Sequence, residues 1–235
     1  MTTAYGGTVP GDGRIGAELL PYLPLRQTLK DGTAVELDFF REDEYEQGFT
    51  LMNQIIVEGQ SWPFMHAYDS VDAFRCYFLS HAAFVVRVCD VPEKFTKATD
   101  STIVENASTG TDLGTVDLRK DAILGCFYVK PNFPDRCSGI CNGGFITNPM
   151  ARRRGVAKLM GKLYCRLAKD LGYRGCLFNL VFASNEASLR LWDGLGFTRL
   201  ACLPQCAELK GIDGFTDAYQ YYRNLLEYDY KNEEV

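Results

Sequence analysis

Two hydrophobic periodicities divide the first part of the chain into predicted strands and helices. Residues 33–40 alternate between apolar and polar side chains and are rich in β-forming residues, which predicts a first strand. Residues 43–59 and 70–79 instead carry apolar side chains at helical spacing. Asp43 and Ser70 stand where helix N-caps are expected. This part of the sequence therefore predicts a strand followed by two helices.

The same patterns continue after residue 80. Residues 158–171 are amphipathic with helical spacing, and a further helix is expected to begin near Asn185. Residues 175–183 are nearly all apolar, which predicts a central strand covered on both faces. The remaining predicted strands are residues 82–89, 121–129, 141–147, 198–203 and 218–223.

A chain of 235 residues is long enough for one domain with a sizeable core. We expect this domain at residues 33–230. Residues 1–32 are rich in glycine and proline and are expected to form an irregular arm packed on the domain. Residues 90–114 are polar and are expected to form a flexible insertion or a long hairpin loop.

Composition narrows the classes of function. The apolar share of 46% and the aromatic share of 13% are typical of a globular protein. The net charge of −5 gives no support to nucleic-acid binding, and no apolar run approaches the roughly 18 residues of a membrane helix. No secretory signal is visible. We therefore expect neither a nucleic-acid nor a membrane partner.

Cysteine and histidine usage argues against a metal site. The nine cysteines lack paired zinc-type spacing, and only His66 and His81 are available to complete such a site. We expect no metal and mostly buried, reduced thiols in a cytoplasmic protein.

A basic turn before the helix at 158–171 is the first candidate site. Residues 143–149 read as a short strand ended by Asn-Pro, and Arg152, Arg153, Arg154 and Gly155 follow. The first amides of a helix lack intrahelical acceptors and carry partial positive charge, so this turn predicts a phosphate or pyrophosphate site. The alternative is an exposed basic helix start without a ligand.

Two motifs resemble the signatures of the GCN5-related N-acetyltransferases. Arg152-x-x-Gly155-x-Ala157 is similar to the turn with which that family binds the pyrophosphate of acetyl-CoA, and residues 185–197 are similar to its second signature, an Asn-x-x-Ala-x-x-Leu-aromatic helix ending in Gly-Phe. The resemblance implies a single α/β domain with a mixed central sheet of about seven strands, helices on both faces and a cofactor cleft between splayed fourth and fifth strands. It implies acetyl-CoA as cofactor, held by Phe145, Thr147, Arg152, Arg153, Arg154, Gly155, Val156, Ala157, Asn185, Ser188 and Trp192.

Within this resemblance, residues 141–147 correspond to the fourth strand. Gly143 and Gly144 offer the flexibility of a bulge, which would leave the backbone of Phe145 and Thr147 free for the pantetheine arm; the alternative is a turn. Trp192 stands where many members have a tyrosine that protonates the leaving thiolate, and an indole N–H is no proton-transfer acid.

The fourth strand also lacks the acidic residue that many members use as a base. Its polar residue is Asn142, and Asn179 lies on the apolar strand at 175–183. Buried amides need partners, so both could be structural; the functional reading is that they hold the substrate in the cleft. Asn185 suits a helix N-cap as well as a site role. We expect Asn142, Asn179 and Asn185 to be the catalytic residues, acting by positioning.

Residues 60–68 are aromatic and irregular and connect the first two predicted helices, where family members commonly build the acceptor site. Trp62 and His66 are therefore candidate substrate-binding residues, together with Asn142 and Asn179. The alternative is a set of core aromatics and an ordinary hydrogen-bonded histidine.

A narrower resemblance covers residues 122–223. Lys130-Pro-Asn-Phe-Pro, Cys141-Asn-Gly-Gly-Phe and Phe178-Asn-Leu-Val-Phe are similar to segments of fungal enzymes that acetylate L-azetidine-2-carboxylate and other proline analogues. The resemblance implies a homodimer and a detoxification or stress role. We predict an acetyl-CoA-dependent N-acetyltransferase for a proline analogue or related amino acid. The alternatives are another amine, such as a polyamine, a drug or a peptide N-terminus, and a non-catalytic acyl-CoA-binding module.

Overall fold

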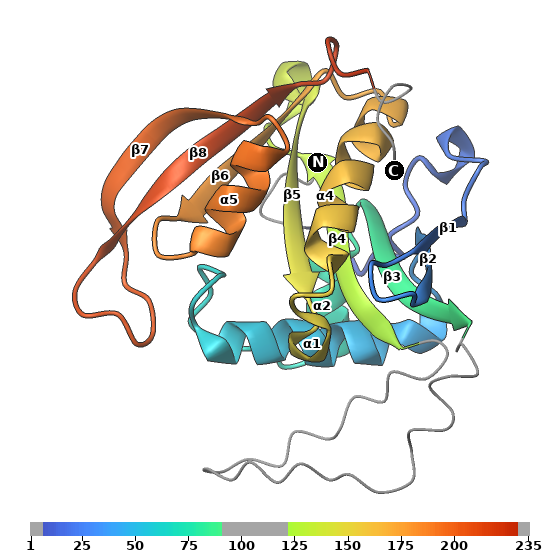
Figure 1. The fold of residues 1–235 in the computed structure, drawn as a ribbon, viewed down its shortest axis with the longest axis horizontal. Helices are drawn as coiled ribbons and strands as arrows, with labels where there is room; N and C mark the ends of the chain where they lie inside the picture. Colours follow the sequence, from blue (N-terminus) through green and yellow to red (C-terminus); the bar gives the residue numbers. More distant parts are fainter. Residues whose placement is uncertain (1–6, 91–121, 230–235) are drawn as a thin grey trace, which may run out of the picture.

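The computed structural model describes residues 7–90 and 122–229, which form one mixed sheet with helices on both faces (Figure 1). The strand order is β1-β2-β3-β4-β5-β6-β8-β7, and β5 and β6 are a parallel pair while the other neighbours are antiparallel. The strands are β1 (Leu25–Thr28), β2 (Ala34–Phe39), β3 (Ala82–Asp90), β4 (Ile123–Pro131), β5 (Ile140–Thr147), β6 (Gly175–Phe182), β7 (Thr198–Ala207) and β8 (Thr216–Asn224).

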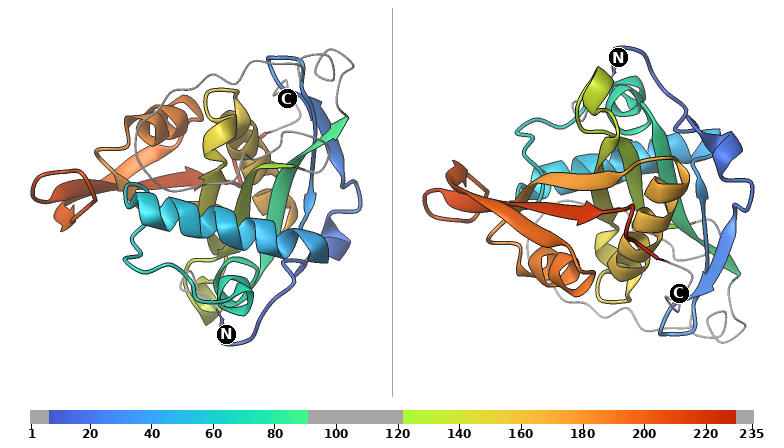
Figure 2. Two further views of the ribbon diagram at one scale, coloured as in Figure 1. Left: turned by 90° about the horizontal axis from the view of Figure 1, so that it is seen from below. Right: turned by 90° about the horizontal axis from the view of Figure 1, so that it is seen from above.

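Two pairs of helices cover the sheet from opposite sides, as Figure 2 shows. Helices α1 (Tyr45–Glu58) and α2 (Val71–Phe78) lie on one face, and α4 (Val156–Asp170) and α5 (Glu186–Gly194) lie on the other. β4 is covered by helices on both faces. Phe127 packs toward α4, and its neighbour Tyr128 packs toward α2 on the opposite face. The alternation along β4 thus divides the core into two layers.

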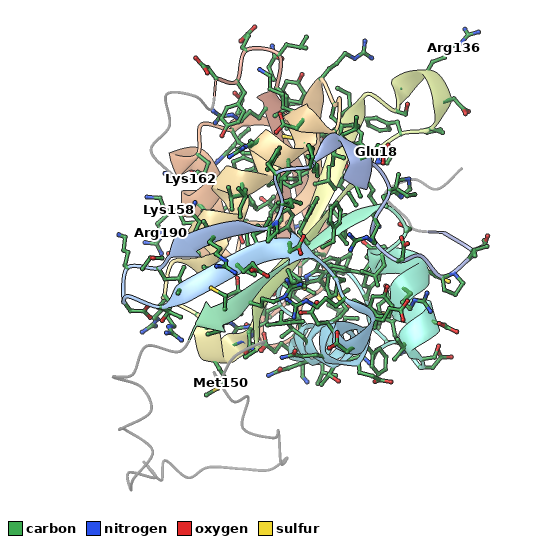
Figure 3. The ribbon with its side chains drawn as sticks, turned by 90° about the vertical axis from the view of Figure 1, so that its right-hand side faces the viewer. Glu18, Arg136, Met150, Lys158, Lys162 and Arg190 are labelled. Carbon is green, nitrogen blue, oxygen red and sulfur yellow. The ribbon has the colours of Figure 1, made fainter. Side chains whose placement is uncertain are left out.

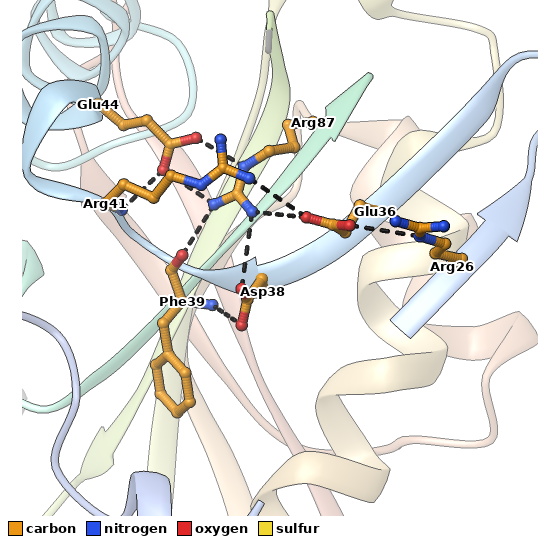
Figure 4. A network of polar contacts seen from close by, with 7 residues as sticks. All are labelled: Arg26, Glu36, Asp38, Phe39, Arg41, Glu44 and Arg87. Atoms are coloured by element: carbon orange, nitrogen blue, oxygen red, sulfur yellow. Dashed lines mark hydrogen bonds and ion pairs between the residues drawn. The ribbon is translucent and has the colours of Figure 1, made fainter. Parts of the chain in front are cut away.

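A buried ion network anchors the start of α1 to the sheet (Figure 4). Arg87 of β3 is fully buried, and its guanidinium donates to Glu44 at 2.6 and 2.9 Å and to Glu36 of β2 at 3.2 Å. It also donates to the Phe39 carbonyl at 2.8 Å. A buried guanidinium is tolerated because carboxylates and a carbonyl satisfy its planar fork.

The predicted order of elements is confirmed, with one strand more than expected. The arm at 1–32 contributes β1, which pairs with β2 from Leu25↔Leu37 to Thr28↔Ala34. Its preceding part packs beside α2 and β3, where Gly13 exchanges backbone hydrogen bonds with Leu79 and Ala83. The predicted insertion at 90–114 lies outside the described residues, except for Asp90 at the end of β3.

Two local expectations were wrong. Asp43 does not cap α1, because it lies in a 3-10 turn, Glu42–Glu44, that precedes the helix. Ser70 does cap α2, and its Oγ accepts from the Ala73 amide at 3.2 Å. The thiols are not mostly buried: Cys126, Cys141, Cys165 and Cys176 are buried, while Cys76, Cys89, Cys137, Cys202 and Cys206 are at least partly exposed.

The structure also bears on membrane insertion. Within residues 7–90 and 122–229, no helix has the length and apolar character needed to span a bilayer.

Candidate functional site

The central feature of the site is a fork between two parallel strands. β5 and β6 pair only at Ile140↔Gly175 and Cys141↔Cys176. Beyond these pairs β6 leaves with β8 and β7, as Figure 1 shows. Within the described part of the chain, the β6-facing edge of β5 therefore has no strand partner from Asn142 to Thr147. Unpaired strand edges offer backbone donors and acceptors to an extended ligand.

The bulge that accompanies this fork lies in β6. The β6–β8 register shifts between Phe178 and Val181, so that one extra residue is inserted on β6. The prediction of a bulge at Gly143 and Gly144 was wrong, because β5 pairs with β4 without interruption from Cys141 to Thr147.

The two glycines instead allow aromatic rings to pack closely against β5. A Cβ on Gly143 would lie 2.6 Å from the Tyr164 ring of α4. A Cβ on Gly144 would lie 2.4 Å from the Trp62 ring and 2.6 Å from the Tyr128 ring on the opposite face. Both positions therefore require the smallest residue.

Aromatic side chains fill the fork on the α4 and α5 side. The Phe145 ring of β5 contacts Phe178 of β6 and Trp192 of α5, with ring centroids 5.6 and 4.9 Å apart. Trp192 is only 5% exposed and also contacts Phe178 and Phe197. Its burial favours packing between the diverging strands over a contact with the cofactor. The backbone edges of Phe145 and Thr147 remain on the open side of β5.

The turn before α4 lies at the wide end of the fork. β5 ends at Thr147, a 3-10 turn at Pro149–Ala151 follows, and Gly155 precedes α4 with φ +90° and open space around a Cβ position. The first helical bond in α4 is from Leu159 N–H to the Gly155 carbonyl at 3.0 Å. The amides of Val156 and Ala157 precede this bond and are available to an anion.

Two of the three arginines of this turn form ion pairs. Arg152 donates to Glu58 at the end of α1 at 2.6 Å. Arg154 donates to Asp31 at 2.5 Å and to Thr33 Oγ1 at 2.7 Å. Burial acts to raise the Asp31 pKa, but the hydrogen bonds from Arg154 and Thr33 outweigh it and hold that pKa below its usual range. Arg153, exposed with φ +66°, completes the turn.

The three predicted asparagines have different environments. Asn142 is 9% exposed, and its Oδ1 accepts from the Gly143 amide at 2.8 Å. Asn179 exchanges two side-chain hydrogen bonds with Asn132, at 2.7 and 3.0 Å. Asn185 caps α5, where its Oδ1 accepts from the Ser188 amide at 3.1 Å. The cap expected of Asn185 is thus confirmed.

Sequence reasoning missed two residues at the narrow end of the fork, Lys130 and Asn132. Both are buried and follow Tyr128 at alternate positions along β4 and its extension. They thus share the face that carries α2. The available signal was a charged and an amide side chain continuing an otherwise apolar strand pattern.

Residues 60–68 contain two predicted substrate-binding residues. Trp62 lies near the fork, and His66 lies at the surface. Trp62 is 8% exposed and lies over Gly144. Its ring contacts those of Phe64, Tyr77 and Tyr128. His66 is exposed. The aromatic cluster thus covers the α2 side of the fork.

A basic groove lies between α4 and the end of α5. Its volume is about 340 Å³, and Lys158, Lys162 and Arg223 line it together with Gly194 and Gly196. Lys158 and Lys162 project from the same side of the molecule as Arg190, as Figure 3 shows. Positive charge therefore continues along α4 from its N-terminal turn.

The comparisons with known proteins agree with this geometry. Residues 82–197, which contain the fork, the α4 turn and α5, match the Acetyltransferase (GNAT) family. A GCN5-related N-acetyltransferase from Kribbella flavida has a similar structure, with a TM-score of 0.63 and 16% identity over 81% of this chain and 97% of that chain. Residues 82–197 belong to the GNAT family of acetyltransferases, which confirms the family and fold that the two motifs predicted.

Two further relatives are informative. N-acetyltransferase aca1 of Schizosaccharomyces pombe is 42% identical over 120 residues, which is 51% of this chain and 57% of that protein. The match thus spans little more than half the length of that relative. The acetyltransferase yncA of Salmonella typhimurium, whose structure holds its cofactor acetyl-CoA, has a TM-score of 0.61 and 13% identity over 83% of this chain and 95% of that chain. At such identities the structural similarities show the fold alone.

Proposed function

We propose that this protein transfers the acetyl group of acetyl-CoA to the nitrogen of a proline analogue or a related small amino acid. The observation that carries the proposal is the unpaired edge of β5, which leads to the free amides at the start of α4. The fork supplies a slot for an extended chain, and the helix start supplies a site for its phosphates.

The residues at both ends of the slot fit acetyl-CoA. Gly155 leaves space for a phosphate to approach the amides of Val156 and Ala157, and Arg153 and Lys158 add positive charge nearby. The backbone of Phe145 and Thr147 would pair with the amide groups of the pantetheine arm. When bound, this cofactor supplies an activated acetyl thioester.

The acceptor would lie on the α2 side of the fork. There Asn142 shares the face of β5 that carries Gly144, and Gly144 lies under the rings of Trp62 and Tyr128. We infer that Asn142 orients the acceptor and that Asn179, through its bond to Asn132, fixes the shape of the fork. Trp192 is buried and has no acidic proton, so the leaving thiolate takes its proton from solvent or another group. Catalysis would then rest on positioning.

A second copy of the chain is the proposed partner, as the narrower resemblance implies. β7 is an edge strand of the sheet, and most of its residues, including Leu200, are exposed. Such an edge favours pairing with another chain. Light scattering after gel filtration tests the homodimer, and the cytoplasmic location and the role in detoxification stay predictions.

The experiment that tests the proposed function is thiol release from acetyl-CoA with separate acceptors. We expect turnover with L-azetidine-2-carboxylate and cis-4-hydroxyproline. Asn142→Ala should lower kcat/KM at least about tenfold through loss of an orienting hydrogen bond. Asn224→Ala is the matched control, because Asn224 ends β8 and, within the described residues, its side chain accepts one hydrogen bond, from the Leu226 amide at 3.0 Å.

Other acceptors decide between the remaining activities. If the protein acetylates spermidine or a short peptide but not the imino acids, its acceptor is a polyamine or a peptide N-terminus and not a proline analogue. Tight acetyl-CoA binding without turnover on any of these amines would contradict the enzymatic proposal and leave a binding module.

A further inference from the structure

Lys130 is a buried lysine held between two tyrosine rings. It is fully buried, and its Nζ donates to the Tyr77 carbonyl of α2 at 3.0 Å. The same nitrogen lies 3.7 Å from the ring centroid of Tyr77 and 4.0 Å from that of Tyr128. Its ammonium group therefore contacts one carbonyl and two ring faces.

This charge has no carboxylate partner within residues 7–90 and 122–229. No Asp or Glu there forms an ion pair with Lys130, whereas Arg87, which is equally buried, is bonded to Glu36 and Glu44. Burial lowers the pKa of Lys130 to about 7. A buried cation is normally retained only where a counter-ion accompanies it.

Lys130 also lies at the narrow end of the fork, next to amide groups. It pairs directly with Asn142 across β4 and β5, and directly paired residues point to the same face of a sheet. Asn142 is nine-tenths buried, and its Nδ2 donates to no described residue. A buried ammonium and an amide donor without a described acceptor thus lie on the same face of neighbouring strands, beside the proposed acceptor position. Both groups can donate hydrogen bonds to an anion.

We propose that Lys130 binds the carboxylate of an amino-acid or imino-acid acceptor, with Asn142 Nδ2 donating to the same carboxylate. The inference rests on the proposed function and names the group that selects its substrate class. It makes the carboxylate a requirement, so that a cyclic amine without one is a poor acceptor although it fits the same space.

Among the groups that face one another here, Lys130 is the side chain that changes charge near neutral pH, because the pKa values of its neighbours lie further away. Burial and then the charge of Lys130 lower the pKa of His81 to about 4, and burial raises the pKa of Tyr128 above its usual range. Tyr77 contributes its carbonyl and ring. A bound carboxylate favours the ammonium, so its affinity is highest below about pH 7. Above that pH the affinity falls by up to about tenfold per unit, and binding takes up a proton.

The experiment measures binding without chemistry. Protein saturated with CoA is titrated calorimetrically with tetrahydrofuran-2-carboxylate, a proline isostere that has no amine, between pH 6 and pH 9. We expect binding to weaken at least about fivefold across this range, and proton uptake at pH 8 in buffers of different ionisation enthalpy. Lys130→Met should weaken binding at least about tenfold at pH 6.5, and Lys130→Arg should retain part of it. Lys30→Met is the matched control, because Lys30 is exposed between β1 and β2, at the edge of the sheet away from the fork.

Turnover with two acceptor pairs gives the second readout. Azetidine-2-carboxylate and proline should exceed azetidine and pyrrolidine in kcat/KM by at least about tenfold in the wild type, and Lys130→Met should remove this preference. Equal turnover of the amines without a carboxylate would overturn the inference while leaving the acetyltransferase proposal intact. So would a pH-independent affinity for the isostere.

Three further outcomes are also decisive. Circular dichroism and CoA binding show whether Lys130→Met folds. If it does not, the pH dependence of isostere binding and the acceptor preference of the wild type decide whether Lys130 binds the carboxylate. If no acceptor is acetylated, the proposed function fails, and the carboxylate titration still decides the role of Lys130. A rate that rises through pH 7 equally for acceptors with and without a carboxylate would instead make Lys130 a general base and contradict the inference.

Discussion

Asn132 and Asn179 bridge the start of the fork with a reciprocal pair of side-chain hydrogen bonds. Asn132 Nδ2 donates to Asn179 Oδ1 at 3.0 Å, and Asn179 Nδ2 donates to Asn132 Oδ1 at 2.7 Å. The backbone of Asn132 also donates to the Ile140 carbonyl at the start of β5, at 2.8 Å. The end of β4, the start of β5 and the β6 bulge are therefore linked at the point where the strands diverge.

This bridge predicts strong coupling between two substitutions. Asn132→Ala or Asn179→Ala leaves one amide without its partner and should lower the free energy of unfolding by about 1–3 kcal/mol. The double variant should lose little more than either single variant, because the second change removes a group that is already unpaired. Urea unfolding of all four proteins measures the coupling. Additive losses would show that the two amides do not stabilise each other.

The bridge also shows where sequence reasoning ends. Strands were predicted at residues 141–147 and, from a nearly continuous apolar run, at 175–183, and Asn179 stood out as an amide in an apolar strand. Its partner is 47 residues away, and no local pattern joins them. Lys130 was overlooked because a lysine before a proline reads as the end of a strand.

The turn before α4 shows the same division. The glycine and the helix start were predictable from Arg152-x-x-Gly155, because the motif itself specifies a backbone conformation. The partners of the arginines were not, because Glu58 and Asp31 come from α1 and from the arm. The added strand β1 was missed because prolines interrupt the pattern before it.

Comparing Gly155→Ala with Gly172→Ala should separate the effect of backbone strain on stability from the effect of a blocked phosphate site on acetyl-CoA binding. Gly155 and Gly172, just after α4, have φ of +90° and +88°, and both have open space around a Cβ position. Alanine at either position should therefore cost about 1–2 kcal/mol of stability. Only Gly155→Ala should weaken acetyl-CoA binding, by about tenfold, because the methyl group occupies the space through which a phosphate approaches.

Calorimetry and urea unfolding of both alanine variants test this. Equal weakening of acetyl-CoA binding in Gly172→Ala would show that altered helix stability, and not the space at Gly155, controls affinity.

Asn185 should have a role beyond its helix cap. Asn185→Ala removes the bond to Ser188 and should cost about 1 kcal/mol of stability, whereas Asn185→Ser keeps a capping oxygen and should stay within about 0.5 kcal/mol of wild type. Both variants lack the side-chain amide donor, so we expect both to lower kcat/KM. Ser70→Ala, which uncaps α2, is the control for a lost cap. Full activity in Asn185→Ser would reduce Asn185 to a cap.

Arg87 should dominate the stability of the α1 face. Arg87→Met leaves Glu36 and Glu44 buried without their shared cation, and the loss of a buried partner costs about 3–5 kcal/mol. Arg190→Met is the control, because Arg190 has a side chain 77% exposed and a surface pair with Glu186 at 2.7 Å. It should cost no more than about 0.5 kcal/mol. Urea midpoints at constant slope compare the two, and similar losses would show that the buried network contributes no more than an exposed pair.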